Sequence, residues 1–162
     1  MPVCNLSDLP ALLKPGQGLL GLDPGSTVIG VAIADPGLSV ASPLTGIARR
    51  KFALDAAAIA AIVKERNIGG LVIGLPKNMD GSEGPSAQSA RTFAANLLKP
   101  NILPVPSMPI AFWDERLSTA AVTRFMIEDD MTRKRRDATV DKAAAAYILQ
   151  GALDALQKIR LG

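Results

Sequence analysis

The sequence predicts an α/β fold in which a mixed five-stranded sheet carries helices on both faces. Three apolar, strand-like runs come first along the chain, and two further strands then alternate with helices. Strands joined by short turns pair antiparallel, whereas strands separated by a helix pair in parallel, so this order predicts both kinds of pairing. Hydrophobic residues make up 48% of the 162 residues, enough for a buried core. We expect residues 1–162 to form a single domain, with residues 1–17 as an N-terminal arm.

The first three strands are expected at residues 18–24, 28–34 and 38–48. The first two runs, GLLGLDP and VIGVAIA, are separated by a short segment containing Gly and Ser, which is typical of a hairpin. Pro43 interrupts the third run. Because proline cannot donate a hydrogen bond to a neighbouring strand, Pro43 favours an edge strand or a β-bulge.

The rest of the chain alternates between helices and strands, with boundaries indicated by proline, capping residues and the spacing of apolar side chains. The expected elements are a helix over 54–66, a strand over 69–75, a helix from Pro85 to before Pro100, a strand over 109–113, a helix from Ser118 or Thr119 to about Asp129, a basic loop over 130–138 and a last helix over about 139–159.

The composition excludes several classes of protein. Histidine is absent, which excludes histidine-dependent hydrolases and histidine zinc sites. The single cysteine, Cys4, excludes an internal disulfide and a multi-cysteine zinc site. No apolar run approaches the roughly 20 residues of a membrane span, and the N-terminus lacks a secretory pattern, so we expect a cytoplasmic location.

Three acidic residues stand at the ends of apolar elements. Asp23 ends the strand GLLGLD, where strand propensity and desolvation both disfavour aspartate. Glu115 follows the strand IAFW, and alternation places it on the face of Trp113, with the preceding acid on the opposite face. Asp141 lies one turn before Ala145 on the apolar stripe of the last helix, so it should face the sheet.

Each acid also has an ordinary structural explanation. Asp23 suits a turn, Glu115 suits a solvated strand end, and Asp141 suits the first turn of a helix, where the helix dipole favours an acid. Taken together in a chain without histidine, they indicate a shared site, because clustered carboxylates need a divalent cation to coexist. Oxygen ligands select Mg²⁺ or Mn²⁺, and such ions can promote phosphodiester hydrolysis.

Four segments resemble the YqgF family, also called RuvX, a family of pre-16S ribosomal RNA nucleases related to Holliday junction resolvases. They follow the family's order and cover most of the chain, and the pair GLP-x-NMDGSEG and DERLST is highly specific. The segments are GLDPGSTVIGVAIAD at 21–35, VIGLPKNMDGSEGPSA at 72–87, WDERLST at 113–119 and VDKAAAAYILQ at 140–150.

The resemblance implies an RNase H-like (RuvC-like) fold and a role in maturing the 5′ end of 16S ribosomal RNA. It implies that Asp23, Glu115 and Asp141 are the catalytic, metal-binding carboxylates, with Mg²⁺ or Mn²⁺ as cofactor. The sequence departs from the family at Thr27, where a basic residue is usual, and its DPGS segment is more similar to RuvC resolvases. Neither departure removes a carboxylate.

Basic and polar residues near the predicted site are candidates for contacts with nucleic acid. The net charge of +3 permits a phosphate-rich partner. The polar loop from Pro76 to Gly84 follows a strand end, where ligand loops commonly lie, and we expect it to be mobile and to contact substrate. Residues 49–51 form a second basic group, which is as compatible with a solvated loop as with a phosphate contact. Asp137 could be an additional acid of the site, but we favour an exposed loop residue. The expected nucleic-acid-binding residues are Lys77, Asn78, Arg116, Arg133, Lys134, Arg135 and Arg136.

Three functions stay open at this point. The first is a nuclease acting on precursor ribosomal RNA, the second a resolvase acting on structured DNA, and the third a non-catalytic nucleic-acid-binding assembly factor. No membrane partner is expected, and the chain could act as a monomer or a homodimer. A glycine-rich match at residues 16–21 precedes a strand instead of joining strand to helix, so it does not predict dinucleotide binding.

Overall fold

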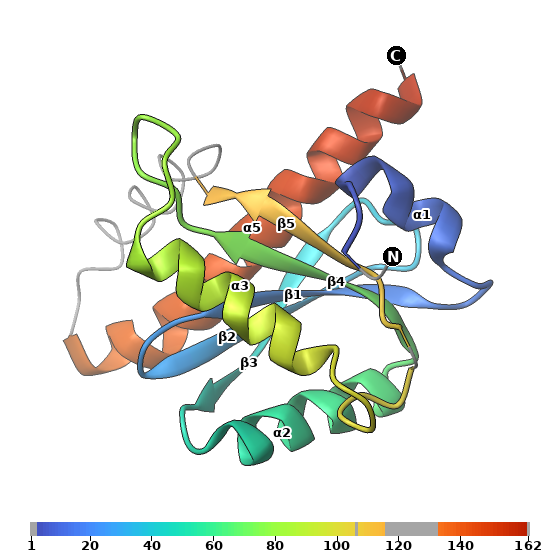
Figure 1. Ribbon diagram of the computed structural model, residues 1–162. Helices are drawn as coiled ribbons and strands as arrows, with labels where there is room; N and C mark the ends of the chain where they lie inside the picture. The colour runs from blue at the N-terminus through green and yellow to red at the C-terminus, as the bar shows by residue number, and fades with distance from the viewer. Residues whose placement is uncertain (1–2, 106, 116–132, 162) are drawn as a thin grey trace.

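The structure is a computed structural model that describes residues 3–105, 107–115 and 133–161, with the backbone alone for residues 133–142 and 160–161. Figure 1 shows a central sheet with helices on both sides. The elements in chain order are η1 (Leu6–Asp8), α1 (Leu9–Leu12), β1 (Gly18–Pro24), β2 (Val28–Ala34), β3 (Ala41–Ala48), α2 (Phe52–Glu65), β4 (Ile68–Leu75), α3 (Pro85–Leu97), β5 (Ile110–Asp114) and α5 (Arg133–Leu161).

The five strands form one mixed sheet in the order β3-β2-β1-β4-β5. The hairpin β1–β2 and the pair β2–β3 are antiparallel, whereas β1–β4 and β4–β5 are parallel. This arrangement confirms the predicted sheet, and the bounds of β1 and β2 are those expected from the sequence. The parallel strands β1, β4 and β5 therefore bring their carboxyl ends to the same edge.

Strand β3 lies at the edge of the sheet and contains the predicted irregularity. The register against β2 shifts between Val31 and Ala32, and Ala32 pairs with Pro43. Residues 38–40 are not part of the strand, contrary to our prediction. They lie in a turn in which the carboxylate of Asp35 accepts hydrogen bonds from the backbone N–H groups of the two residues before β3.

Helices α2 and α3 cover one face of the sheet, and α5 covers the other (Figure 1). The α5 face is closely packed because glycines stand where side chains would collide. A Cβ atom on Gly21 would lie 2.8 Å from Cβ of Leu149, and a Cβ atom on Gly151 would lie 2.9 Å from the ring of Trp113. Helix α5 is thus seated directly on β1 and β5.

Helix α5 begins at Arg133, so residues 133–138 are helical instead of forming the predicted loop. This stretch contains no proline or glycine between Arg133 and Lys142, and its charged residues are compatible with a helix. Asp137 is accordingly a helical residue. The helix predicted to end at about Asp129 lies outside the described residues. Within the described part of the chain, no helix is long and apolar enough to cross a membrane.

Candidate active site

Asp23 lies at the carboxyl end of β1, on the face that α5 covers. Its partner across the hairpin is Gly30. Side chains alternate along a strand, and Gly21, two residues earlier, faces Leu149 of α5, so Asp23 projects from the same face. On the other side of β1, Leu22 pairs with Ile73 of β4, which places the end of β4 next to Asp23.

Glu115 follows β5 directly and lies on the same face. Trp113 packs in the apolar cluster under α5, whereas Phe112 packs in the cluster under α3, which confirms the predicted alternation. Glu115 reaches back over β4, where its Oε1 atom would lie 3.0 Å from a Cβ atom placed on Gly74. Two acids separated by about 90 residues of chain therefore approach one another across a glycine on the strand between them.

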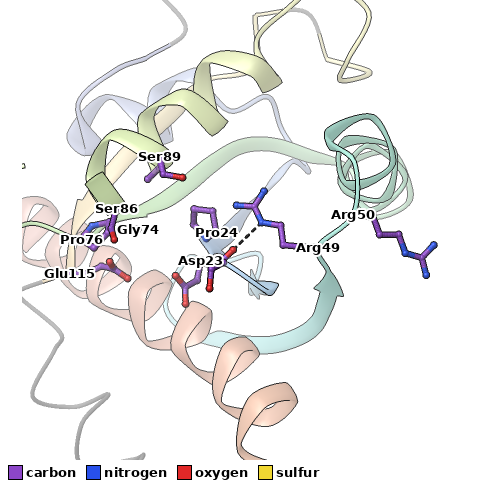
Figure 2. Close-up of a pocket in the computed structure, with 12 residues that line it drawn as sticks. Asp23, Pro24, Arg49, Arg50, Gly74, Pro76, Ser86, Ser89 and Glu115 are labelled. Atoms are coloured by element: carbon purple, nitrogen blue, oxygen red, sulfur yellow. Dashed lines mark hydrogen bonds between the residues drawn. The ribbon is translucent and has the colours of Figure 1, made fainter. Parts of the chain in front are cut away.

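The two carboxylates line one pocket, with a volume of about 620 Å³, at the carboxyl edge of the parallel strands. Figure 2 shows Asp23 and Glu115 on the side nearest α5, with Arg49, Ser86 and Ser89 around the rest of the pocket. Both strands that carry the acids flank β4, so their backbones are roughly 10 Å apart at this edge. That spacing suits two carboxylates that hold one group between them.

The pKa of Glu115 is raised to about 7, first because the side chain is buried and then because Asp23 and Asp114 place like charge nearby. A carboxylate that resists ionisation beside a second carboxylate is a site that a cation would stabilise. Oxygen ligands of this kind fit Mg²⁺ or Mn²⁺. The donor set present therefore fits the metal that the sequence predicts.

The raised pKa of Glu115 predicts how the stability of the metal-free protein depends on pH. Between about pH 4.5 and pH 7 the folded state keeps a proton that the unfolded state has released, so the free energy of unfolding should fall as the pH rises through this range. The fall should be about 1–3 kcal/mol after allowance for partial exposure. Urea unfolding in EDTA between pH 4.5 and pH 8 measures it.

Two variants separate this contribution from the rest of the titration curve. Glu115→Gln removes the titrating carboxyl and should flatten the curve above pH 4.5, while Glu65→Gln, at the exposed end of α2, should leave it unchanged. The assignment fails if Glu115→Gln and the unaltered protein lose the same stability between these pH values.

The third predicted acid, Asp141, lies on α5, about two turns after the first residue of that helix. It is therefore not in the first turn, and the helix dipole does not account for its position. Its side chain lies outside the described residues, so its convergence with Asp23 and Glu115 stays a prediction. Within the part of the chain whose side chains are described, no three acids or cysteines come close enough to hold a metal ion.

The predicted nucleic-acid contacts fall into three groups. Lys77 and Asn78 lie in the loop after β4, where the Asn78 side chain donates to the hydroxyl of Ser82 at 3.0 Å and Glu83 pairs with Arg91 at 2.6 Å. These bonds tie the loop to itself and to α3; its mobility stays a prediction. Arg116 lies outside the described residues. The basic run at residues 133–136 forms the first turn of α5, and its side chains also lie outside the described residues.

The structure also brings residues to the pocket that we did not predict as site residues. Arg49 belongs to the basic group at residues 49–51, and charge alone does not distinguish a binding residue from a residue of a solvated loop. Ser86 and Ser89 carried no signal beyond their place in a helix that begins after a strand end. Their spacing of three residues puts both on one face of α3, which is the signal that could have identified them.

The class of the protein follows from this fold. Two solved structures share it: a yeast mitochondrial Holliday junction resolvase, with a TM-score of 0.53, 10% sequence identity and coverage of 96% of this chain and 85% of that one, and Thermus thermophilus RuvC in complex with a Holliday junction substrate, with a TM-score of 0.53, 14% identity and coverage of 88% and 96%. The protein has the RNase H-like fold of the RuvC-like resolvases, with the acidic pocket at the carboxyl edge of its parallel strands.

The chain belongs to the RuvX family, described as Holliday junction resolvase, whose sequence profile matches residues 17–155. A relative from Rhodospirillum rubrum is 53% identical over 161 residues, covering 99% of this chain and 97% of the relative. One from Roseobacter denitrificans is 55% identical over 156 residues, covering 96% and 94%. Both carry the name "Putative pre-16S rRNA nuclease". The family assignment made from the four sequence segments is confirmed, and the family is one of nucleases.

Proposed function

We propose that this chain is a metal-dependent nuclease that hydrolyses phosphodiester bonds at the pocket lined by Asp23 and Glu115. The observation that carries the proposal is the meeting of these two acids, from β1 and the end of β5, in one pocket where the pKa of Glu115 is raised to about 7. Two repelling carboxylates cost stability in a folded protein unless they serve a ligand. A cation that bridges a phosphate is the ligand that fits them best.

Asp23, Glu115 and Asp141 would hold Mg²⁺ or Mn²⁺, which when bound activates water and stabilises the charge of the cleaved phosphate. Asp23 and Glu115 would provide ligand oxygens from the carboxyl ends of β1 and β5, the two strands that flank β4, and Asp141 would approach from α5. The rigid sheet fixes the first two acids, so little reorganisation is needed when substrate binds. We place Lys77, Asn78, Arg116 and the basic start of α5 (Arg133, Lys134, Arg135 and Arg136) along the path of the nucleic-acid backbone.

We propose precursor 16S ribosomal RNA as the substrate, because the relatives at 53% and 55% identity carry the name "Putative pre-16S rRNA nuclease". We further propose that the chain processes the 5′ end of this RNA in the cytoplasm, as the resemblance of the four sequence segments implies. The second candidate is a four-way DNA junction, which the family description and the two solved resolvases favour. A resolvase would act as a homodimer that presents two sites, whereas a monomer suffices for RNA processing. A purely structural assembly factor on this fold would have no use for an acidic pocket that destabilises it.

Removal of metal tests the proposal directly. The purified chain should cleave a precursor 16S ribosomal RNA fragment in Mn²⁺ or Mg²⁺, and EDTA should abolish cleavage, because the acidic pocket then repels the phosphate. Excess Mn²⁺ added after EDTA should restore it. Cleavage products are resolved on a denaturing gel.

The same assay with a synthetic four-way DNA junction separates the two substrates. Faster cutting of the junction by a protein that sediments as a dimer would favour the resolvase. Salt-sensitive RNA binding without metal-dependent cleavage of either substrate would overturn the nuclease proposal and leave the assembly factor.

A further inference from the structure

Arg49 occupies the same pocket as the acids and is held in place by contacts on three sides. Its Nε atom donates to the carbonyl oxygen of Gly25 at 2.9 Å, its guanidinium lies 5.1 Å from the ring centroid of Phe93, and its Nη1 atom is 3.8 Å from Oδ2 of Asp55. The Asp55 side chain is only 1% exposed. A long side chain fixed in this way has lost much of its conformational freedom before any ligand arrives.

The position of Asp55 explains why Arg49 is fixed but does not use up its hydrogen-bonding capacity. A separation of 3.8 Å is too long for a hydrogen bond, and Oδ2 of Asp55 has no hydrogen-bond partner among the described residues. Arginine has five N–H donors in a planar fork. Within the described part of the chain, the side chain of Arg49 donates one hydrogen bond, to Gly25. The terminal N–H groups are left to a ligand in the pocket.

Two hydroxyl groups line the pocket together with Arg49. Ser86 and Ser89 are exposed residues on the first turns of α3, three positions apart and so on one face of the helix. Figure 2 shows the Arg49 guanidinium turned toward the pocket next to Pro24, across the pocket from Ser89, while Arg50 extends away from it. The lining of one pocket thus includes two carboxylates, a guanidinium and two hydroxyls.

The groups that line the pocket indicate the chemistry of its ligand. The acids alone would repel an anion, whereas a guanidinium fork with two hydroxyls is a donor set that suits a phosphate. Both parts open into one pocket of about 620 Å³. A nucleic-acid strand carries a phosphate at every nucleotide, so a strand whose cleaved phosphate lies at the acids brings a neighbouring phosphate close to Arg49.

We propose that Arg49, with Ser86 and Ser89, binds the backbone phosphate next to the one that is cleaved, and so positions the strand over Asp23 and Glu115. The inference rests on the proposed nuclease function and extends the site to residues that would bind phosphate and not metal. Arg49 is a positioning residue that acts on backbone phosphate, so it should contribute to binding irrespective of base sequence.

The test measures binding separately from cleavage. Full-length chain carrying Asp23→Asn is titrated in Mg²⁺ onto a fluorescein-labelled single-stranded RNA at several KCl concentrations, and anisotropy gives Kd. Adding Arg49→Gln should raise Kd about tenfold, the scale of a lost charge-assisted hydrogen bond. It should also reduce the slope of log K against log salt by about 0.7, as expected for one phosphate contact on a single strand.

Matched variants keep the result interpretable. Arg66→Gln, at the exposed end of α2 away from the pocket, removes the same charge and should leave Kd and the slope nearly unchanged. Arg49→Lys should preserve the slope but recover only part of the affinity, because lysine lacks the planar fork. The double variant Ser86→Ala and Ser89→Ala, which leaves the contacts of Arg49 intact, should raise Kd about threefold to tenfold.

Each outcome either supports or overturns the proposed phosphate site at Arg49. If Arg49→Gln weakens binding no more than Arg66→Gln, the phosphate subsite is wrong and Arg49 only neutralises Asp55. If Arg49→Gln shifts the melting temperature and does not fold properly, the serine variant decides, and wild-type Kd in that variant overturns the proposal. Failure of the nuclease function would show instead as absent metal-dependent cleavage by the unaltered chain, with these binding differences still measurable.

Discussion

Asp23→Asn should lower the rate of metal-dependent RNA cleavage by at least about a thousandfold. The substitution keeps the size of the side chain and removes the negative charge that would hold the proposed cation at the carboxyl end of β1. Loss of a metal ligand removes several kcal/mol of transition-state stabilisation, and about 4 kcal/mol corresponds to a factor of a thousand. Single-turnover cleavage of a labelled precursor RNA at saturating protein measures the effect without a contribution from weaker binding.

Asp141→Asn should cause a loss of the same order, because ligands that act as a unit are not additive. The double variant Asp23→Asn and Asp141→Asn should then be little worse than either single variant. Asp8→Asn, far from the pocket on η1, controls for a general change of charge. Cleavage by Asp23→Asn at the unaltered rate would show that the reaction occurs at another site, and full activity of Asp141→Asn would remove α5 from the metal site.

Gly74→Ala is expected to reduce cleavage by about a hundredfold although it alters no charged or polar side chain. The added Cβ atom would lie 2.7 Å from Cδ1 of Ile148 and 3.0 Å from Oε1 of Glu115, closer than such atoms pack. Either the Ile148 side chain of α5 or the Glu115 side chain must move. A displacement of about 1 Å at a reacting centre can cost a factor of about a hundred. Metal titration by calorimetry should show weaker binding in parallel with the loss of rate.

A second glycine on the same sheet provides the control. A Cβ atom on Gly18 would lie 3.8 Å from Cδ1 of Ile68, an ordinary contact, so Gly18→Ala should leave cleavage and metal affinity within about twofold. Thermal unfolding distinguishes a displaced site from an unfolded protein. Normal activity in Gly74→Ala would mean that Glu115 is not held against β4 when metal is bound.

The sheet could be predicted from the sequence because its signals are local. The runs that form β1 and β2 are short, apolar and separated by a turn, and Pro43 favoured an edge or a bulge for the third strand. The same patterns placed Asp23 and Glu115 at strand ends, and the alternation along β5 gave the face of Glu115. A shared site was indicated by the three acids together in a chain without histidine and by the resemblance to a family. The order of the strands in the sheet explains how Asp23 and Glu115 reach one pocket.

Other features depend on long-range contacts or on boundaries that the sequence marks weakly. The start of α5 was placed six residues too late because a run of charges is compatible with both loop and helix. Arg49 forms an ion pair with the buried Asp55, and the two residues lie on either side of the start of α2. No periodic pattern in the sequence marks such a contact. The close approach of the Glu115 side chain to Gly74 likewise depends on how the two segments pack together, and neither segment alone predicts it.

The contact between Gly151 and Trp113 has a consequence for attempts to make this protein more robust. Replacing glycine by alanine within a helix is a standard route to higher thermal tolerance, since it restricts the unfolded chain. At Gly151 the extra methyl group would meet the indole ring of Trp113 at 2.9 Å, so that either this ring or the helix that carries Asp141 must shift. Stabilising substitutions should therefore be made at exposed positions of α2, where they do not displace the residues of the proposed active site.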